Sequence, residues 1–493
     1  MLKLLTGENA KQTSKWLSTK NRRFTQPIFC CKVNFMKYHI IVYGCQMNIS
    51  DSERVSAVLE SAKYKKTQNI NRANLIAVVM CSVRQSAVDR VHGLVEKLKT
   101  IKKANPKEPY GESARRRQIK TILTGCILKK DKKIFLKSFD YVLDIKDIKK
   151  IPDILKINPR QISRDRVNYD KGNYLDIIPE YENKFSANVP IMTGCNNFCS
   201  YCVVPHTRER EISRPTKEII SEIKNLIKGG CKKIWLLGQN VNSYKSGKID
   251  FAGLLKLVNN IKGDFWLKLM TNHPKDMSDK LIRTMANCEK VCRHVHLPAQ
   301  AGDDDILVAM NRKYAIAYYI KLVGKIRKVL NDQTNLKQNL WNPPAAITTD
   351  IIVGFPGETK KQFNNTAKLM REVKFDLAYI AKYSVRPGTA AAKLSDNVSG
   401  AEKKRRELEL IKILRKTALE NNKKYISQTV KTLVAGRSKA GEWFGKTATE
   451  KNVKFLMTND KINLIWKFVN VKIIKAQDFG LNGEIINYES SEK

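Results

Sequence analysis

Acidic residues are scarce in this chain of 493 residues, which contains 47 Asp and Glu against 91 Lys and Arg. The formal net charge of +44 excludes an acidic protein surface and favours a polyanionic partner, of which RNA or DNA is the obvious example. A lysine-rich genome would also encode basic proteins of every kind, so charge by itself does not identify the partner.

Long apolar runs are absent as well, and none approaches the roughly 18 consecutive apolar residues of a membrane-spanning helix. Cysteine is too rare, at 11 residues, for a secreted disulfide scaffold of this size, which favours a reducing compartment. The hydrophobic fraction of 42% is sufficient for ordinary cores, and the length implies several domains. We therefore expect a multidomain cytoplasmic protein that does not contact the membrane.

The N-terminal residues 1–35 form a basic extension in which Glu8 is the only acid, and they lack the apolar centre of a signal peptide. They could be a transit peptide, or they could precede the true start of the protein. Met36 lies directly before the first predicted strand, which favours the second interpretation.

Three closely spaced cysteines are the most informative feature. Three residues separate Cys195 from Cys199, and two separate Cys199 from Cys202. Thiolates at this spacing can surround one cubic iron–sulfur cluster from a single loop. Because a four-iron cube would then keep one iron without a protein ligand, that iron could bind a substrate or cofactor, as an open position does in catalytic zinc sites. A structural zinc loop is the alternative, although zinc usually takes paired Cys-x-x-Cys units.

The residues around these cysteines resemble the radical S-adenosylmethionine enzymes, and within them the methylthiotransferase branch. Tyr201 before the last cysteine, the sequence VVPHTRERE over 203–211 and the sequence GCQMN over 44–48 carry this resemblance. The run LGQNVNSY over 237–244 is most similar to the members that methylthiolate isopentenyladenosine in tRNA. The resemblance extends over nearly the whole chain.

The resemblance implies an enzyme that binds S-adenosylmethionine at a [4Fe-4S] cluster held by Cys195, Cys199 and Cys202. A radical would remove hydrogen from C2 of an N6-isopentenyladenosine beside the anticodon of tRNA. Sulfur would then be inserted at C2, and a second S-adenosylmethionine would methylate the sulfur. The expected partners are the tRNA anticodon stem-loop and a low-potential electron donor of the flavodoxin or ferredoxin type, and we expect a monomer. Alternatives are the same chemistry on threonylcarbamoyl-adenosine in tRNA or on a ribosomal protein, and a non-catalytic, metal-stabilised RNA-binding protein.

Residues 36–150 predict a parallel α/β domain, because apolar strands at 38–43, 75–80 and 121–124 alternate with helices. A capping box formed by Ser50 and Glu53 predicts that the first helix begins there.

Cys45, Cys81 and Cys126 each come directly after one of these strands. The carboxyl ends of parallel strands share one edge of the sheet, so the three positions could converge. Each thiol taken singly would more often be a buried small hydrophobe. The resemblance assigns the three to a second [4Fe-4S] cluster.

Residues 189–396 predict a β/α barrel or partial barrel, with function at the carboxyl ends of its strands. The predicted strands are 190–193, 233–237, 265–270, 291–297, 346–353 and 377–383. Candidate cofactor-binding residues at those ends or in motifs of the family are Tyr201, Gln239, Asn240, Gln300 and Gly354. For each of them, a loop residue that satisfies the backbone is the alternative.

A second capping box at Ser399 predicts a long helix to about Tyr425, and 425–489 then predicts a small antiparallel β-barrel with strands at 430–435, 441–446, 454–457 and 463–474. The barrel resembles the RNA-binding barrel appended to this family. Arg437 and Lys439 are its candidate RNA contacts, with Trp443 and Phe444 as stacking residues, although Trp443 also suits a core.

Arg208, Arg210 and Arg214 follow the three-cysteine loop and could clamp RNA phosphates or the cofactor carboxylate. Ordinary surface charge is the alternative. Glu209 stands where relatives usually have glycine, and we expect its carboxylate to pair with the flanking arginines and to weaken anion binding.

Overall fold

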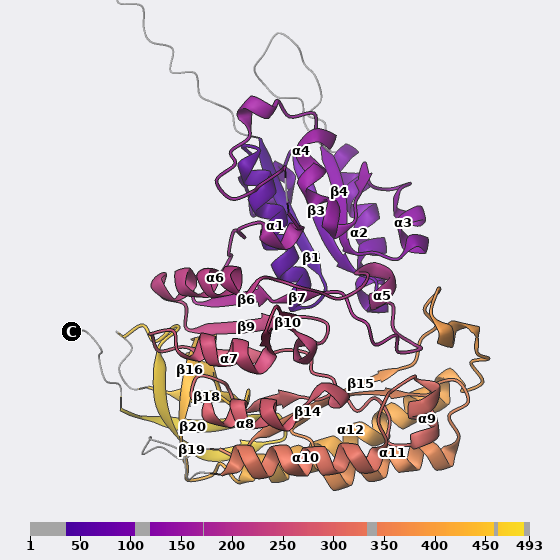
Figure 1. The fold of residues 1–493 in the computed structure, drawn as a ribbon, viewed down its shortest axis with the longest axis vertical. Coiled ribbons are helices and arrows are strands. Elements are labelled where there is room, and N and C mark those ends of the chain that lie inside the picture. The colour runs from indigo at the N-terminus through magenta and orange to yellow at the C-terminus, as the bar shows by residue number, and fades with distance from the viewer. Residues whose placement is uncertain (1–35, 104–118, 171, 333–342, 458–461, 488–493) are drawn as a thin grey trace, which may run out of the picture. The chain divides into compact units, whose positions relative to one another are not determined.

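The computed structural model describes residues 36–103, 119–170, 172–332, 343–457 and 462–487 (Figure 1). The predicted extension over 1–35 and the last two residues of the predicted C-terminal barrel lie outside the described residues. The α/β fold class predicted from the sequence is confirmed, with a parallel sheet, a partial barrel and a closed C-terminal barrel along the chain.

The first sheet is parallel throughout and has the strand order β2-β1-β3-β4-β5. Its central strand β3 is buried along its whole length. Alternate residues of β3 contact opposite layers: Ala77 packs with the core that includes α1, and Val78 packs with the core that includes α2. The elements are β1 (Lys37–Tyr43), α1 (Gln46–Ser61), β2 (Lys65–Lys66), β3 (Leu75–Cys81), α2 (Gln85–Lys103), β4 (Lys120–Cys126), α3 (Lys129–Phe135), β5 (Tyr141–Val142) and α4 (Ile151–Ile154).

The predicted start of α1 at Ser50 is wrong, because the helix begins at Gln46 with Cys45 as its N-cap. The side chain of Asn48 accepts a hydrogen bond from the backbone N–H of Cys45 at 3.2 Å. Ser50 lies inside the helix, where its hydroxyl donates to the carbonyl of Asn188 at 3.2 Å. The helix therefore begins about one turn earlier, at a capping box formed by Cys45 and Asn48.

Glu53, in α1, is almost fully buried, and its burial raises its pKa to about 7. Since this pKa lies above the ordinary value of 4.5, the folded protein binds the proton more tightly than the unfolded chain. We expect stability to fall as the pH rises from about 5 to 8, by about 1.4 kcal/mol for each unit of the pKa shift. Denaturant unfolding across this range measures the effect. Glu53→Gln should flatten the pH dependence, whereas Glu96→Gln on the exposed face of α2 should not.

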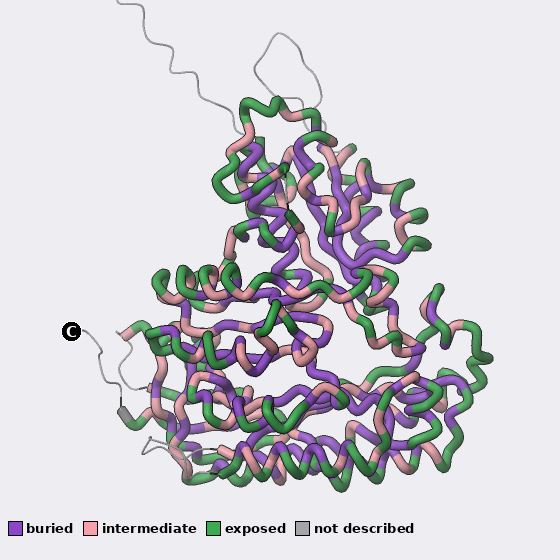
Figure 2. The backbone as a smooth tube through the Cα atoms, viewed as in Figure 1, coloured by how far each residue is buried: buried purple, intermediate pink, exposed green. Residues whose placement is uncertain are grey.

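The six longer central strands form an open, partial barrel with the order β6-β9-β12-β13-β14-β15. An isolated parallel bridge from Leu267 to Val291 joins its two three-stranded halves. Figure 2 shows that many residues along these strands are buried. The strands are β6 (Ser186–Pro190), β9 (Lys233–Leu237), β12 (Trp266–Leu269), β13 (His294–His296), β14 (Ala346–Val353) and β15 (Leu377–Lys382).

Helices cover the outer face of the partial barrel, and their apolar residues form one core with alternate strand residues such as Ile347 and Ile351. The intervening residues, including Thr348 and Asp350, therefore lie on the inner face. These helices are α6 (Thr216–Lys228), α7 (Phe251–Asn259), α8 (Asp279–Asn287), α10 (Ile316–Asn331) and α11 (Lys360–Val373). Two shorter helices outside this core are α5 (Val204–Thr207) and α9 (Asp304–Ala309). Short strands are β7 (Met192–Thr193), β8 (Ile212–Ser213), β10 (Lys245–Ser246) and β11 (Ile249–Asp250).

The long helix α12 (Gly400–Lys423) begins where the capping box predicts, because the hydroxyl of Ser399 accepts a hydrogen bond from the N–H of Glu402 at 3.2 Å. The C-terminal barrel is closed, with the order β16-β17-β18-β20-β19 and β19 pairing with β16. The prediction missed its fifth strand, and the barrel is not antiparallel throughout because β18 and β20 are parallel. The strands are β16 (Thr429–Arg437), β17 (Trp443–Thr447), β18 (Asn452–Leu456), β19 (Phe468–Gln477) and β20 (Gly480–Asn487).

None of the helices in the described ranges is both long and apolar enough to cross a membrane.

Candidate active site

The loop with Cys195, Cys199 and Cys202 follows β7 at the carboxyl end of the barrel strands. Backbone contacts fix its shape: the N–H of Cys195 donates to the carbonyl of Glu209 at 3.2 Å, and the N–H of Cys202 donates to that of Cys199 at 3.0 Å. The hydroxyl of Ser200 donates to the carbonyl of Ala309 at 2.7 Å. All three cysteines are free thiols and only partly buried, so their sulfur atoms are available as ligands.

Gly194 precedes this loop and has a φ of 80°, in the left-handed region that favours glycine. A Cβ at this position would lie 2.0 Å from the carbonyl oxygen of Arg210. Only glycine therefore allows residues 194–195 to pack directly against residues 209–210.

Arg312 contacts the cysteine loop, and sequence reasoning missed it. Its Nη1 donates to the sulfur of Cys199 at 3.3 Å, and its Nη2 donates to the carbonyl of Pro298 at 3.0 Å. The hydroxyl of Tyr314 accepts from its Nε at 3.1 Å. Because Arg312 lies 113 positions from Cys199 in a short turn without a motif, nothing local in the sequence identifies it.

Amide side chains with an unpartnered oxygen atom lie at the carboxyl ends of β9 and β12. Asn240 donates to Asp276 through its Nδ2 at 2.7 Å. Within the described part of the chain, its Oδ1 is buried without a hydrogen-bond partner, as are the Oε1 of Gln239 and the Oδ1 of Asn272. Buried polar atoms are nearly always satisfied in proteins, so these oxygens fit contacts to a bound polar molecule.

Tyr201 and Gln300 lie close to the same edge. Tyr201 is partly buried against the small core formed by Ala301, Phe355 and their neighbours. Gln300 is mostly buried and extends the sheet, because its N–H donates to the carbonyl of Asp350 at 2.8 Å. Their predicted contacts to a cofactor remain predictions.

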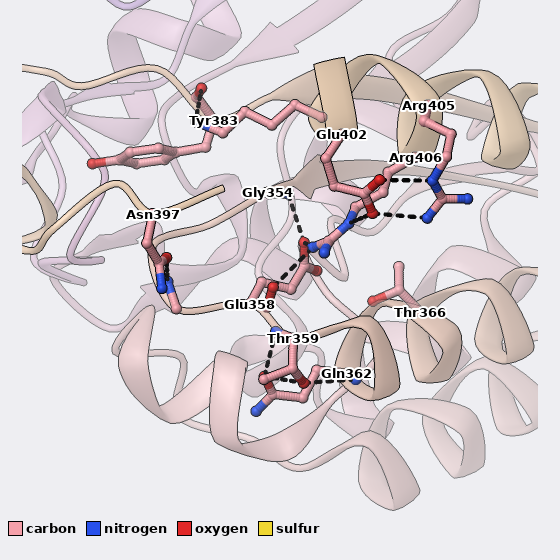
Figure 3. Close-up of polar contacts among 12 residues, drawn as sticks. Gly354, Glu358, Thr359, Gln362, Thr366, Tyr383, Asn397, Glu402, Arg405 and Arg406 are labelled. Carbon is pink, nitrogen blue, oxygen red and sulfur yellow. Dashed lines mark hydrogen bonds and ion pairs between the residues drawn. The ribbon is translucent and has the colours of Figure 1, made fainter. Parts of the chain in front are cut away.

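Gly354 has a structural reason of its own to be glycine. Its φ is 69°, and a Cβ there would lie 2.3 Å from Cγ of Lys403 in α12. Its N–H donates to Oε2 of Glu358 at 2.6 Å, and Arg406 donates to the same oxygen at 2.7 Å (Figure 3). Glu358 and Arg406 are thus a buried ion pair that joins the turn after β14 to α12, and the predicted cofactor role of Gly354 remains a prediction.

The structure brings Cys45, Cys81 and Cys126 together at one edge of the first sheet. Cys81 and Cys126 end the neighbouring strands β3 and β4 and lie opposite each other in the register. Asn48 bridges the group, because it contacts the backbone and sulfur of Cys45 and lies 3.8 Å from the sulfur of Cys126. The predicted convergence of the three cysteines is therefore present, and their role as cluster ligands remains a prediction.

Among the described residues, no three His, Cys, Asp or Glu side chains converge closely enough to hold a single metal ion. A cluster does not require such convergence, because each of its irons takes a separate thiolate.

The side chains of Arg208 and Arg214 are both buried, so the RNA contacts predicted for them find no support in the structure. Arg208 is 2% exposed and pairs with Asp51. Arg214 is 7% exposed, and it pairs with Glu222 at 2.8 Å and donates to the carbonyl of Pro190 at 2.9 Å. Neither guanidinium reaches the surface where an RNA phosphate would bind.

Arg210 is exposed, and its guanidinium lies over the ring of Phe198 at 4.3 Å. Glu209 does not pair with the flanking arginines as expected, because its carboxylate pairs with Lys146. Glu209 has a φ of 63°, which explains why glycine suits this position.

In the C-terminal barrel, Arg437, Lys439 and Phe444 are exposed and remain candidate RNA contacts. Trp443 is 4% exposed and belongs to the barrel core, so it is not a stacking residue.

Comparison with known proteins agrees with this geometry. Residues 189–370 match the model of the radical SAM superfamily, and residues 37–145 match that of the uncharacterized protein family UPF0004. The chain is therefore a radical S-adenosylmethionine protein, a class that implies S-adenosylmethionine and a [4Fe-4S] cluster as cofactors.

A tRNA-2-methylthio-N(6)-dimethylallyladenosine synthase from Thermoanaerobacter sp. (strain X514) is 40% identical over 459 residues, which cover 91% of this chain and 92% of the relative. One from Clostridium novyi (strain NT) is 38% identical over 462 residues, which cover 91% of this chain and 96% of the relative. The chain belongs to the family of these synthases. Among solved structures, a radical S-adenosylmethionine methyltransferase from Kitasatospora setae matches with a TM-score of 0.49 and 11% identity over 73% of this chain and 77% of that one.

Proposed function

We propose that this protein methylthiolates C2 of N6-isopentenyladenosine next to the anticodon of tRNA, with S-adenosylmethionine and two [4Fe-4S] clusters. The observation that carries the proposal is the presence of two separate cysteine trios. One trio is on the loop after β7, and the other is at the carboxyl edge of the first sheet. If the protein held only one cluster, or bound RNA without catalysis, the trio of Cys45, Cys81 and Cys126 would have no function.

Cys195, Cys199 and Cys202 would hold the first cluster, and the unpartnered amide oxygens of Gln239, Asn240 and Asn272 would accept hydrogen bonds from the cofactor. Cluster and cofactor together supply a low-potential electron and a radical able to remove hydrogen from an unactivated carbon. The chain itself binds and orients these groups, so that the reaction takes place between prepositioned partners.

The inner face of the partial barrel offers a site for the adenine base. Tyr379, on β15, is 60% exposed and can stack on a base. His296 lies beside it, with its Nδ1 3.0 Å from the hydroxyl of Thr348 and its Nε2 3.2 Å from Oδ2 of Asp350. These polar groups are placed to contact the edges of a base held against Tyr379.

RNA would be bound by Arg210 beside the cysteine loop and by Arg437 and Lys439 on the C-terminal barrel, which are all exposed. Phosphate contacts release counterions, so affinity for tRNA should fall steeply with salt. The protein would act as a monomer and receive electrons from a small flavodoxin-type or ferredoxin-type donor.

Replacing Arg437 and Lys439 together with glutamine should weaken tRNA binding. The plot of log affinity against log salt should become shallower by up to about 2, because each lost phosphate contact contributes about 0.7 to 0.9 to the slope. Filter binding between 50 and 200 mM salt measures this. The control is Lys325→Gln, on α10, whose lysine pairs with Asp279 at 2.8 Å. An unchanged slope would exclude this part of the barrel from the RNA interface.

The test of the proposal is nucleoside mass spectrometry of tRNA from a strain that lacks the protein. The 2-methylthio group should disappear while the isopentenyl precursor accumulates. The anaerobically purified protein should contain about eight irons per chain. A 2-methylthio mark that persists, or zinc in place of iron, would refute the assignment.

A further inference from the structure

Besides its ion pair with Asp51, the buried side chain of Arg208 contacts the sulfur of Cys126. Its Nη2 pairs with Asp51, and its Nη1 donates to the hydroxyl of Tyr174 at 3.0 Å. The third donor, Nε, points at the sulfur of Cys126 at a distance of 2.8 Å. Arg208 and Asp51 are 2% and 1% exposed, so water does not compete for any of these contacts.

The contact crosses between two regions of the chain. Cys126 and Asp51 belong to the first sheet and α1, whereas Arg208 follows the loop of the other cysteine trio by only six residues. The next residue, Glu209, accepts a hydrogen bond from the N–H of Cys195 at 3.2 Å. Arg208 therefore contacts a cysteine of one trio through its side chain, and its neighbour Glu209 contacts a cysteine of the other trio through its backbone carbonyl.

A guanidinium that donates to a ligand sulfur favours the state in which the cluster carries more negative charge. Reduction adds one electron to a [4Fe-4S] cluster and increases the negative charge on its sulfurs, so both the hydrogen bond and the positive charge raise the reduction potential. The carboxylate of Asp51 counteracts part of this charge effect because it pairs with the same guanidinium.

We propose that Arg208 is a positioning residue that sets the reduction potential of the cluster held by Cys45, Cys81 and Cys126, with Asp51 limiting the size of its effect. This inference rests on the proposed second cluster. It assigns no RNA contact to Arg208 and no direct part in the chemistry. It gives the second cluster a higher potential than the same three cysteines would give alone.

The test uses the full-length protein with Cys195, Cys199 and Cys202 all replaced by alanine, so that only the second trio can hold iron. Iron and sulfide are measured first, and about four irons per chain are expected. The midpoint potential is then measured by anaerobic titration with dithionite, which supplies the electron, and followed by electron paramagnetic resonance. In this background the variants are Asp51→Asn and the double variant Asp51→Asn with Arg208→Met.

The two variants should shift the potential in opposite directions. Asp51→Asn leaves the guanidinium uncompensated and should raise the potential, whereas the double variant removes the donor and both charges and should lower it below the parent value. A tenfold change in the ratio of reduced to oxidised cluster corresponds to about 59 mV for a one-electron couple. We expect a change of at least this size between the two variants.

The matched control is Arg210→Met, which removes an exposed arginine two residues away and should leave the potential unchanged. Equal potentials in the parent and in Asp51→Asn would overturn the inference while leaving the second cluster intact, and this single variant decides the matter even if the double variant does not fold. A background protein without iron would overturn the second cluster and this inference together.

Discussion

Replacing Cys199 with alanine is expected to abolish methylthiolation while the affinity for tRNA stays within about twofold of the parent protein. The iron content should fall from about eight to about four per chain, because the loop loses one of its three ligands while the second trio is untouched. Activity is measured by nucleoside mass spectrometry, iron by colorimetry and affinity by filter binding.

Cys231→Ala is the matched control for this change. Cys231 is a free cysteine that is 2% exposed in the core behind the partial barrel, away from either trio. Its loss should leave both the iron content and the activity unchanged apart from a small effect on stability. Methylthiolation that survives Cys199→Ala would show that the loop after β7 does not carry the cluster needed for the chemistry.

Replacing Glu358 with alanine should destabilise the protein by about 1 to 3 kcal/mol, because the buried Arg406 would lose this partner and keep only its pair with Glu402 at 2.8 Å. The side chains of Glu358 and Arg406 are 0% and 5% exposed. The measurement is equilibrium unfolding in denaturant. Truncation of Glu358 alone leaves the buried charge of Arg406 less fully paired, whereas truncation of both side chains removes that charge.

The double variant Glu358→Leu with Arg406→Met should therefore recover most of the lost stability. A second control removes an exposed pair. Asp279→Ala breaks the contact of Asp279 with Lys325, and because these side chains are 54% and 43% exposed, the stability should stay nearly unchanged. A Glu358→Ala protein as stable as the parent would mean that the turn after β14 does not depend on α12.

The sequence predicts well those features that depend on spacing along the chain. The loop of Cys195, Cys199 and Cys202 is predicted as a cluster-binding loop from the short intervals between these three cysteines. The convergence of Cys45, Cys81 and Cys126 follows from their positions after successive parallel strands, because such strands share an edge. Five strands of the partial barrel are predicted by apolar runs, and β9 and β14 have the predicted limits, whereas the first strand, β6, lies at Ser186–Pro190 instead of at 190–193.

The features that the sequence does not predict depend on distant partners. Whether an arginine faces water or the interior is decided by residues far along the chain. Arg208 pairs with a residue 157 positions away, and Glu209 pairs with Lys146 rather than with its neighbours. Trp443 is likewise removed from the surface by the closure of the barrel, which includes a strand that was not predicted.

The closure of the C-terminal barrel also limits how it can meet another molecule. Every strand in it is paired on both sides, with β18 and β20 completing the circle. Among its described strands, such a barrel has no open edge at which a foreign segment could be added as a further strand. Recognition by this part of the protein must therefore rely on side chains projecting from its outer wall and its connecting loops, which can be altered one at a time without reopening the wall itself.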